Sequence, residues 1–125
     1  MLGLRHLALN VVDIQKSTDF YVTVLGMKIE WQPDADNVYL TTGSDNLALH
    51  KVAKVNRTHS PLDHLGFLLS TPEEVDQWAA KIKKLGYKLS KEPKTHRDGA
   101  RSFYFTDPEG NLIQMIFHPP ISKAK

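Results

Sequence analysis

Hydrophobic and polar positions follow the same order twice along the chain. Short apolar runs typical of buried strands occupy residues 5–11 and 63–69. Each run is followed by a segment with apolar residues at helical spacing, which ends at Gly26 in the first copy and at Gly86 in the second. Three strand-like segments follow each helix. The pattern therefore predicts an internal repeat of strand, helix and three strands.

The two helices carry clear start and stop signals. Asp13 is the expected N-terminal cap of the first helix. Thr71 caps the second, with Pro72 in its first turn and Glu74 completing a capping box. A glycine after each helix suits the left-handed residue that ends it. The positions expected to face the core are Ile14, Phe20, Tyr21, Val24 and Leu25 in the first helix, and Val75, Trp78, Ala79 and Ile82 in the second.

The remaining segments alternate as strands do. The expected strands are residues 27–32, 36–42 and 46–52 in the first half, and 87–92, 101–106 and 111–118 in the second. We expect an α+β fold of two repeated βαβββ modules whose sheets form a shared cup, a common place for a ligand. The whole chain, 1–125, is then one domain, with module 1 at 1–56 and module 2 at 57–125.

Composition narrows the class of protein. The 125 residues are 41% hydrophobic and 24% charged, which argues against a disordered chain, and the net charge is +2. That small excess, spread along the chain, predicts no nucleic-acid partner. No apolar run is long enough to span a membrane, and no secretory signal is recognisable, so we expect a cytoplasmic protein. There is no cysteine, so any bound metal is held by nitrogen and oxygen.

Two histidines hold equivalent positions in the repeat. His6 and His64 each lie at the start of a first strand, so near-symmetry would bring them close together. A single such histidine is more often a hydrogen-bonded structural residue, but two equivalent ones favour ligands of Zn, Ni, Mn, Co or Fe. Gln114 is the third candidate ligand, because it is the only polar residue in the apolar run 112–116. It must find a partner, as at a sheet edge, or face a polar cavity.

Two further residues are candidates for handling substrate. His50 faces the cavity if Ala48 does, and lies on the surface if Leu47 and Leu49 face inward instead. An inward His50 could be a metal ligand or a general base. Tyr104 precedes Gln114 across a tight hairpin, so antiparallel pairing could place both on one sheet face. The alternative for Tyr104 is a packed strand aromatic.

The chain resembles the vicinal oxygen chelate superfamily. This group includes glyoxalase I, extradiol dioxygenases, methylmalonyl-CoA epimerases, fosfomycin-resistance thiol transferases and bleomycin-resistance proteins. The resemblance covers about residues 4–119, and its most specific motifs are His6-Leu7-Ala8-Leu9-Asn10-Val11, Ser17-Thr18-Asp19-Phe20-Tyr21 with Leu25-Gly26-Met27, and Phe103-Tyr104-Phe105-Thr106-Asp107-Pro108-Glu109-Gly110-Asn111-Leu112-Ile113.

The resemblance implies a divalent metal held by residues of the first and last strands of each module. His6 and His64 match first-strand ligands, and Gln114 stands where most members have glutamate. The remaining position is Ala48 or Leu49, so the four-ligand pattern of lactoylglutathione lyase is not reproduced. Ala8 likewise departs from the threonine of the thiol transferases. A homodimer is expected.

Two functions follow from the resemblance. The first is a metal-dependent enzyme acting on a small oxygen-bearing substrate, as a lyase, isomerase, thiol transferase or dioxygenase. The alternative is a metal-free protein that binds or sequesters a small molecule such as a drug, which an uncharged Gln114 favours.

Overall fold

A computed structural model of the chain describes residues 2–55 and 61–122. It contains two compact units, Met1–His59 and Ser60–Lys125, each built as β-α-β-β-β. They are called the first and the second unit below. The boundary expected between residues 56 and 57 lies outside the described residues. The α+β class and the two βαβββ repeats predicted from the sequence are confirmed.

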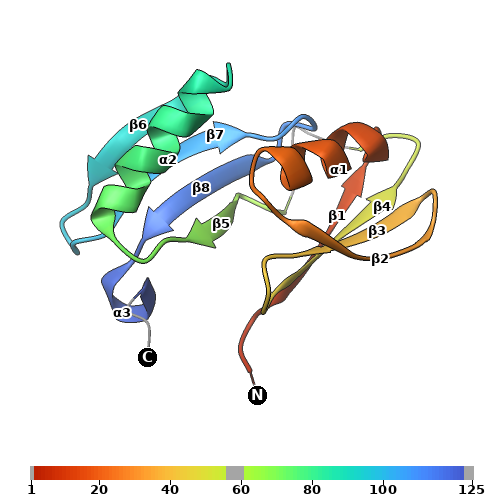
Figure 1. Cartoon of the computed structure of the whole chain (residues 1–125), viewed down its shortest axis with the longest axis horizontal. Coiled ribbons are helices and arrows are strands. Elements are labelled where there is room, and N and C mark those ends of the chain that lie inside the picture. The colour runs from red at the N-terminus through yellow and green to blue at the C-terminus, as the bar shows by residue number, and fades with distance from the viewer. Residues whose placement is uncertain (1, 56–60, 123–125) are drawn as a thin grey trace. The chain divides into compact units, whose positions relative to one another are not determined.

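The first unit is a four-stranded mixed sheet covered by one helix (Figure 1). Its strands lie in the order β1-β4-β3-β2, with β1 parallel to β4 and the other pairs antiparallel. Helix α1 packs against β3 and β4. The elements are β1 (His6–Val11), α1 (Ile14–Thr23), β2 (Lys28–Asp34), β3 (Asn37–Thr41) and β4 (Asn46–Lys51).

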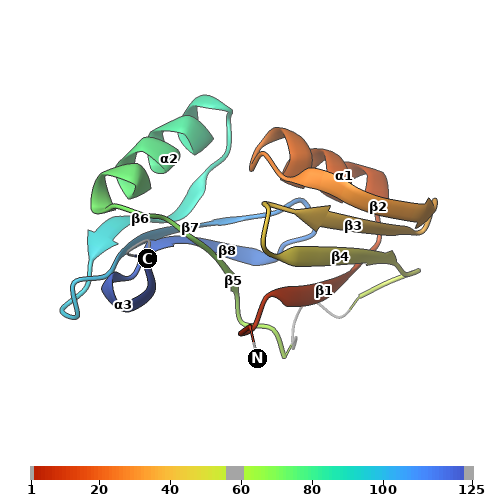
Figure 2. The same ribbon diagram turned by 60° about the horizontal axis from the view of Figure 1, so that its bottom comes forward.

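The second unit repeats this plan, with strand order β5-β8-β7-β6 and β5 parallel to β8. Helix α2 covers β6, β7 and β8, and Figure 2 shows it lying along one side of this sheet. The elements are β5 (Leu65–Leu68), α2 (Pro72–Lys84), β6 (Leu89–Thr95), β7 (Arg101–Thr106), β8 (Leu112–Phe117) and the short helix α3 (Pro119–Ser122).

The expected strand bounds are nearly right, and the largest differences have a physical reason. Strands β2 and β6 continue through Pro33 and Pro93, past the expected ends at residues 32 and 92. Both are edge strands, in which a residue without a backbone N–H is tolerated. Both also contain register shifts against their neighbours, which are common at sheet edges. Helix α3 was not predicted.

The helices begin and pack as predicted. The Asp13 side chain accepts a hydrogen bond from the N–H of Lys16, and Thr71 Oγ1 accepts one from the N–H of Glu74. The expected core positions are buried except Ile14 and Trp78, which are half-buried. The apolar sheet residues buried with them include Leu9, Val11, Val38, Leu40, Leu47, Ala48 and Leu49 in the first unit and Phe103, Phe105, Ile113 and Met115 in the second.

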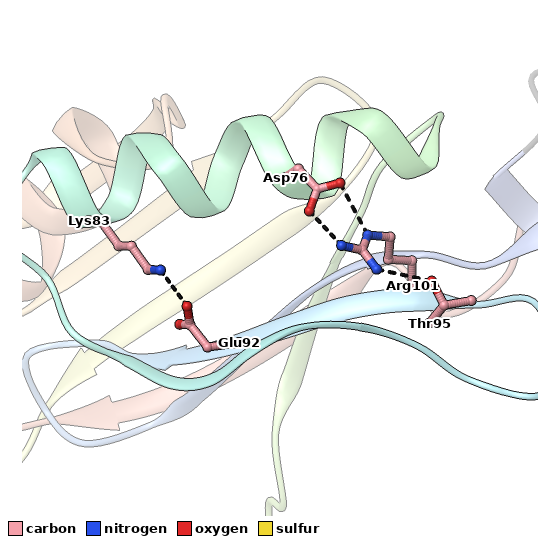
Figure 3. A network of polar contacts seen from close by, with 5 residues as sticks. All are labelled: Asp76, Lys83, Glu92, Thr95 and Arg101. Carbon is pink, nitrogen blue, oxygen red and sulfur yellow. Dashed lines mark hydrogen bonds and ion pairs between the residues drawn. The ribbon is translucent and has the colours of Figure 1, made fainter.

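Charged side chains join α2 to the sheet beneath it (Figure 3). Arg101 on β7 donates from Nε and Nη2 to the Asp76 carboxylate, at 3.2 and 2.7 Å, and from Nη1 to Thr95 Oγ1 at 3.0 Å. The hydrogen bonds to Asp76 raise the pKa of the Arg101 guanidinium. Lys83 and Glu92 form a second ion pair. Because α2 covers one face of this sheet, only the other face is left for functional side chains.

No helix within residues 2–55 and 61–122 is both long and apolar enough to cross a membrane.

Candidate functional site

The face of each sheet that does not carry the helix is called its open face. In the first unit, parallel pairing places His6 beside Asn46 and Asn10 beside His50. Side chains directly opposite each other share a face, and every second residue along a strand does so too. His6 and His50 therefore lie on the same face of the first sheet. Leu47 and Leu49, on the other face of β4, are buried and pair with the buried Leu40 and Val38 of β3.

A chain of hydrogen bonds fixes the orientation of His6. The Asn46 side chain donates from Nδ2 to the Glu30 carboxylate, and its Oδ1 lies 2.7 Å from Nδ1 of His6. A carboxylate only accepts hydrogen bonds, so the amide nitrogen must face Glu30 and the amide oxygen must face the ring. The His6 Nδ1–H therefore donates to Asn46. In the neutral ring the lone pair is then on Nε2, which has no recorded partner in the described part of the chain.

His50 is held by the same kind of chain. Asn37 donates from Nδ2 to both carboxylate oxygens of Asp34, at 2.9 and 3.2 Å. Its Oδ1 lies 2.6 Å from Nδ1 of His50. By the same reasoning, His50 donates from Nδ1 and keeps a lone pair on Nε2. The first unit thus contains the same arrangement twice. In each case an acidic residue orients an asparagine side chain, and the asparagine fixes the tautomer of a histidine.

The spacing of His6 and His50 separates their roles. In the pairing register, His6 is level with Asn46, four residues before His50 on β4. Four residues of strand span about 13 Å. Each ring is also hydrogen-bonded to an asparagine of its own strand pair. This separation favours His50 as a hydrogen-bond acceptor or base, and not as a ligand of an ion bound at His6.

In the second unit, Gln114, Tyr104 and His64 gather on the open face. Gln114 pairs directly with Tyr104 on β7 and with Gly66 on β5, as the hairpin between residues 104 and 114 predicted. The ring of His64, just before β5, contacts that of Tyr104 edge to face, with centroids 5.6 Å apart. Gly66 is next to Gln114, and a Cβ added there would lie 4.0 Å from Gln114 Oε1. The amide side chain makes no recorded hydrogen bond in the described residues.

Acidic and basic side chains complete this cluster. Asp63 Oδ1 lies 2.6 Å from Nδ1 of His64, so the ring donates to the carboxylate and keeps its lone pair on Nε2. The ammonium group of Lys91 lies 5.6 Å from the centre of the Tyr104 ring. His96, which directly follows β6, differs from these histidines. Its Nε2 lies 3.2 Å from Oγ of Ser102 on β7, so that nitrogen already has a protein partner.

These observations test whether the predicted ligands fit a metal ion. Metal-binding histidines in proteins generally give the second ring N–H to a carboxylate or carbonyl oxygen, which fixes the tautomer that binds metal. His6 and His64 both have this arrangement, and Gln114 offers an amide oxygen that makes no hydrogen bond to the described residues. No group of three His, Asp or Glu side chains suited to an ion occurs within residues 2–55 and 61–122. The chemistry of each of these residues, taken in its own unit, suits a divalent ion.

Comparison with known proteins gives the family. The pattern of the Glyoxalase/Bleomycin resistance protein/Dioxygenase superfamily matches residues 3–115 of the chain. The chain belongs to this superfamily. The fold agrees: a lactoylglutathione lyase from Agrobacterium tumefaciens superposes with a TM-score of 0.80, covering 95% of this chain and 96% of that one, at 21% identity.

Curated relatives within the superfamily are enzymes. A glutathione transferase FosA from Serratia marcescens is 32% identical over 118 residues, which are 90% of this chain and 79% of the relative. A metallothiol transferase FosB from Bacillus licheniformis is 29% identical over 118 residues, which are 92% of this chain and 75% of the relative. These relatives agree with the resemblance found in the sequence.

Sequence reasoning missed the residues that orient the histidines. Asp63 was visible as the neighbour of His64, and such an adjacent pair is a usable signal. Glu30 and Asn46 were not recognisable, because their relation to His6 depends on the register of three strands. Asp34 and Asn37 were hidden for the same reason.

Proposed function

We propose that this protein is a metal-dependent enzyme of the glyoxalase superfamily that acts on a small substrate with two neighbouring oxygen atoms. Its divalent ion, Zn, Ni, Mn, Co or Fe, is held by His6, His64 and Gln114. The observation that carries the proposal is shared by the two histidines. Each gives Nδ1–H to a side-chain oxygen and keeps Nε2 open, although they use different partners.

The metal, when bound, supplies a Lewis acid for polarising a substrate oxygen. Gln114 contributes a neutral oxygen, so it leaves more positive charge at the site than a glutamate would. Tyr104, in contact with His64 and paired with Gln114, is placed to hydrogen-bond a substrate atom through its phenol. Its hydroxyl can donate or accept, which suits it to orienting substrate or moving a proton.

The relatives support one reaction class as the first to test. The transferases FosA and FosB are similar over nine-tenths of this chain. The motif Ser102-Phe103-Tyr104-Phe105 resembles the thiol transferases of the superfamily. A group transfer to a small oxygen-bearing molecule is therefore the preferred reaction. Lyase, isomerase and dioxygenase activities are to be tested beside it. Lactoylglutathione lyase activity is the least favoured of these, since position 48 carries an alanine.

One observation favours a second function. Gln114 brings no negative charge, and an ion held by two histidines and an amide is bound more weakly than one held with a carboxylate. A metal-free protein that binds or sequesters a small molecule would need no such charge. Under that alternative, added metal would leave both stability and ligand binding unchanged.

Elemental analysis of protein purified without chelators tests the proposal. We expect about one divalent ion per chain. Reloading the chelator-treated protein with nickel, manganese, zinc or iron should raise its melting temperature by several degrees, since an ion that binds only the folded chain stabilises it. An empty protein that none of these ions stabilises would contradict the enzyme reading and support the sequestering alternative.

We also propose that the protein is a homodimer, as the resemblance implies. Sedimentation analysis of the full chain measures the mass directly, and a species of 14.2 kDa at high concentration would contradict it.

A further inference from the structure

One oriented histidine, His50, is not among the proposed metal ligands. The Nε2 atom of His50 has its lone pair fixed by the Asp34–Asn37 chain, and no other polar contact of its ring is recorded within the described residues. Asp34 and Asn37 hold the ring in the tautomer whose Nε2 can accept a hydrogen bond. The arrangement is suited to receiving a hydrogen bond at Nε2 from a bound molecule.

An aromatic surface lies beside this acceptor. The ring of Tyr39 meets that of His50 edge to face, with centroids 5.9 Å apart. On the neighbouring strand, Trp31 stacks on Tyr39 with centroids 5.1 Å apart and planes 24° from parallel. Trp31 is 58% exposed. An indole held flat by a second ring, yet open to solvent, is a surface on which a planar group can stack.

Next to Tyr39, the residues at the same level on β4 and β1 are small. Tyr39 pairs with Ala48, and Ala48 pairs with Ala8, so the next two side chains on the open face are methyl groups. A bulky residue at position 48 would stand beside the Tyr39 ring. The open face of the first sheet thus offers an aromatic pair, two small neighbours and one oriented acceptor.

We propose that the first unit carries a ligand subsite of its own on this face. It takes a planar small molecule that bears a hydroxyl or N–H group at its edge. The planar part packs against Tyr39 and Trp31, and the edge group donates to Nε2 of His50. The subsite uses only side chains of β2, β3 and β4, so it requires no metal ion. It rests on the small-molecule binding given above as the second function, for which it names the contact residues, and it can fail separately from the metal site.

Nuclear magnetic resonance on the chelator-treated, full-length chain tests this proposal. The probe is 2-naphthol, and the matched control ligand is 2-methoxynaphthalene, which has the same rings and no donor. The indole N–H of Trp31 and the ring nitrogens of His50 report binding. Trp78, on α2 of the second unit, is the internal control in the same spectrum.

The tautomer is read first, and His50 is expected to be protonated at Nδ1. Adding 2-naphthol should shift the Trp31 and His50 signals saturably and leave Trp78 unchanged. The methyl ether should bind about fivefold more weakly, because it lacks the one hydrogen bond that the naphthol donates to His50. In H50F, with the fold checked by circular dichroism, the two ligands should bind equally. W31A should lose binding of both.

Each of the following results would overturn the proposal. One is a His50 protonated at Nε2. Another is the absence of saturable shifts at Trp31 and His50, or equal binding of the two ligands to the unaltered chain. The last is a Trp31 signal that moves with protein concentration and not with probe, because a second copy of the chain would then occupy this face. Metal binding measured separately on the same sample shows whether the proposed function stands.

Discussion

The Nδ1 atom of His64 lies 2.6 Å from the Oδ1 atom of Asp63, its neighbour in the chain. His6, the equivalent residue of the first repeat, reaches the same state through Asn46, its partner across β1 and β4. The two halves therefore orient equivalent histidines by different means. What they share is the outcome, an open Nε2, and this is the property that a metal ligand needs.

Removing the carboxylate beside His64 should weaken metal binding. In D63A the ring can rotate and exchange tautomers, so nickel affinity measured by calorimetry should fall about 10- to 100-fold. E73A removes another exposed carboxylate of the second unit, at the start of α2, and should bind nickel as the unaltered chain does. Equal affinities in D63A and E73A would show that Asp63 has no part in positioning His64.

Restoring a carboxylate at position 114 should strengthen metal binding. A negative charge next to a divalent ion favours it strongly, so Q114E should bind nickel about tenfold more tightly or better. Q77E adds the same charge to the exposed face of α2 and controls for the change in net charge. Unchanged affinity in Q114E would remove Gln114 from the proposed ligands.

The tautomer of His6 should depend on Glu30. In E30Q the residue at position 30 can donate as well as accept, so the Asn46 amide is no longer forced into one orientation. Nitrogen chemical shifts should then report a mixture of His6 tautomers. His64 should stay protonated at Nδ1 in the same spectrum, because its partner is untouched. A single, unaltered His6 tautomer in E30Q would mean that Glu30 does not fix it.

Loss of the cap of α2 should destabilise the fold without altering the metal site. Thr71 Oγ1 accepts the N–H of Glu74, and T71A should lower the free energy of unfolding by about 1 kcal/mol in urea titrations. T71S keeps the hydroxyl and should keep most of the stability. If T71A and T71S unfold at the same urea concentration, the hydrogen bond contributes nothing measurable.

Most of the fold could be predicted because local signals recur in both repeats. Periodicity placed α1 and α2 within a few residues, and the caps at Asp13 and Thr71 are visible in sequence since they act over three residues. The ends of β2 and β6 were misjudged, because both strands continue through a proline. Proline is tolerated on an edge strand, and edge position is a property of the whole sheet.

The candidate site also has residues that local sequence signals reveal and residues that depend on the pairing of distant strands. His6, His64 and Gln114 stand out as polar residues in apolar strands, and the pairing of Tyr104 with Gln114 follows from a short hairpin. The face on which His50 lies required the register of β1 against β4, residues forty positions apart. The oriented tautomers depend on side chains from three strands, which no local pattern records.

Calorimetric titration with nickel tests the central claim most directly. The chelator-treated protein should bind one ion per chain, H6A and H64A should each lose that binding, and H96Q should retain it, because the Nε2 of His96 is already bound to Ser102. Circular dichroism confirms that each variant is folded. Equal titration of H6A, H64A and H96Q would contradict the account, since the two oriented histidines would then not be the ligands.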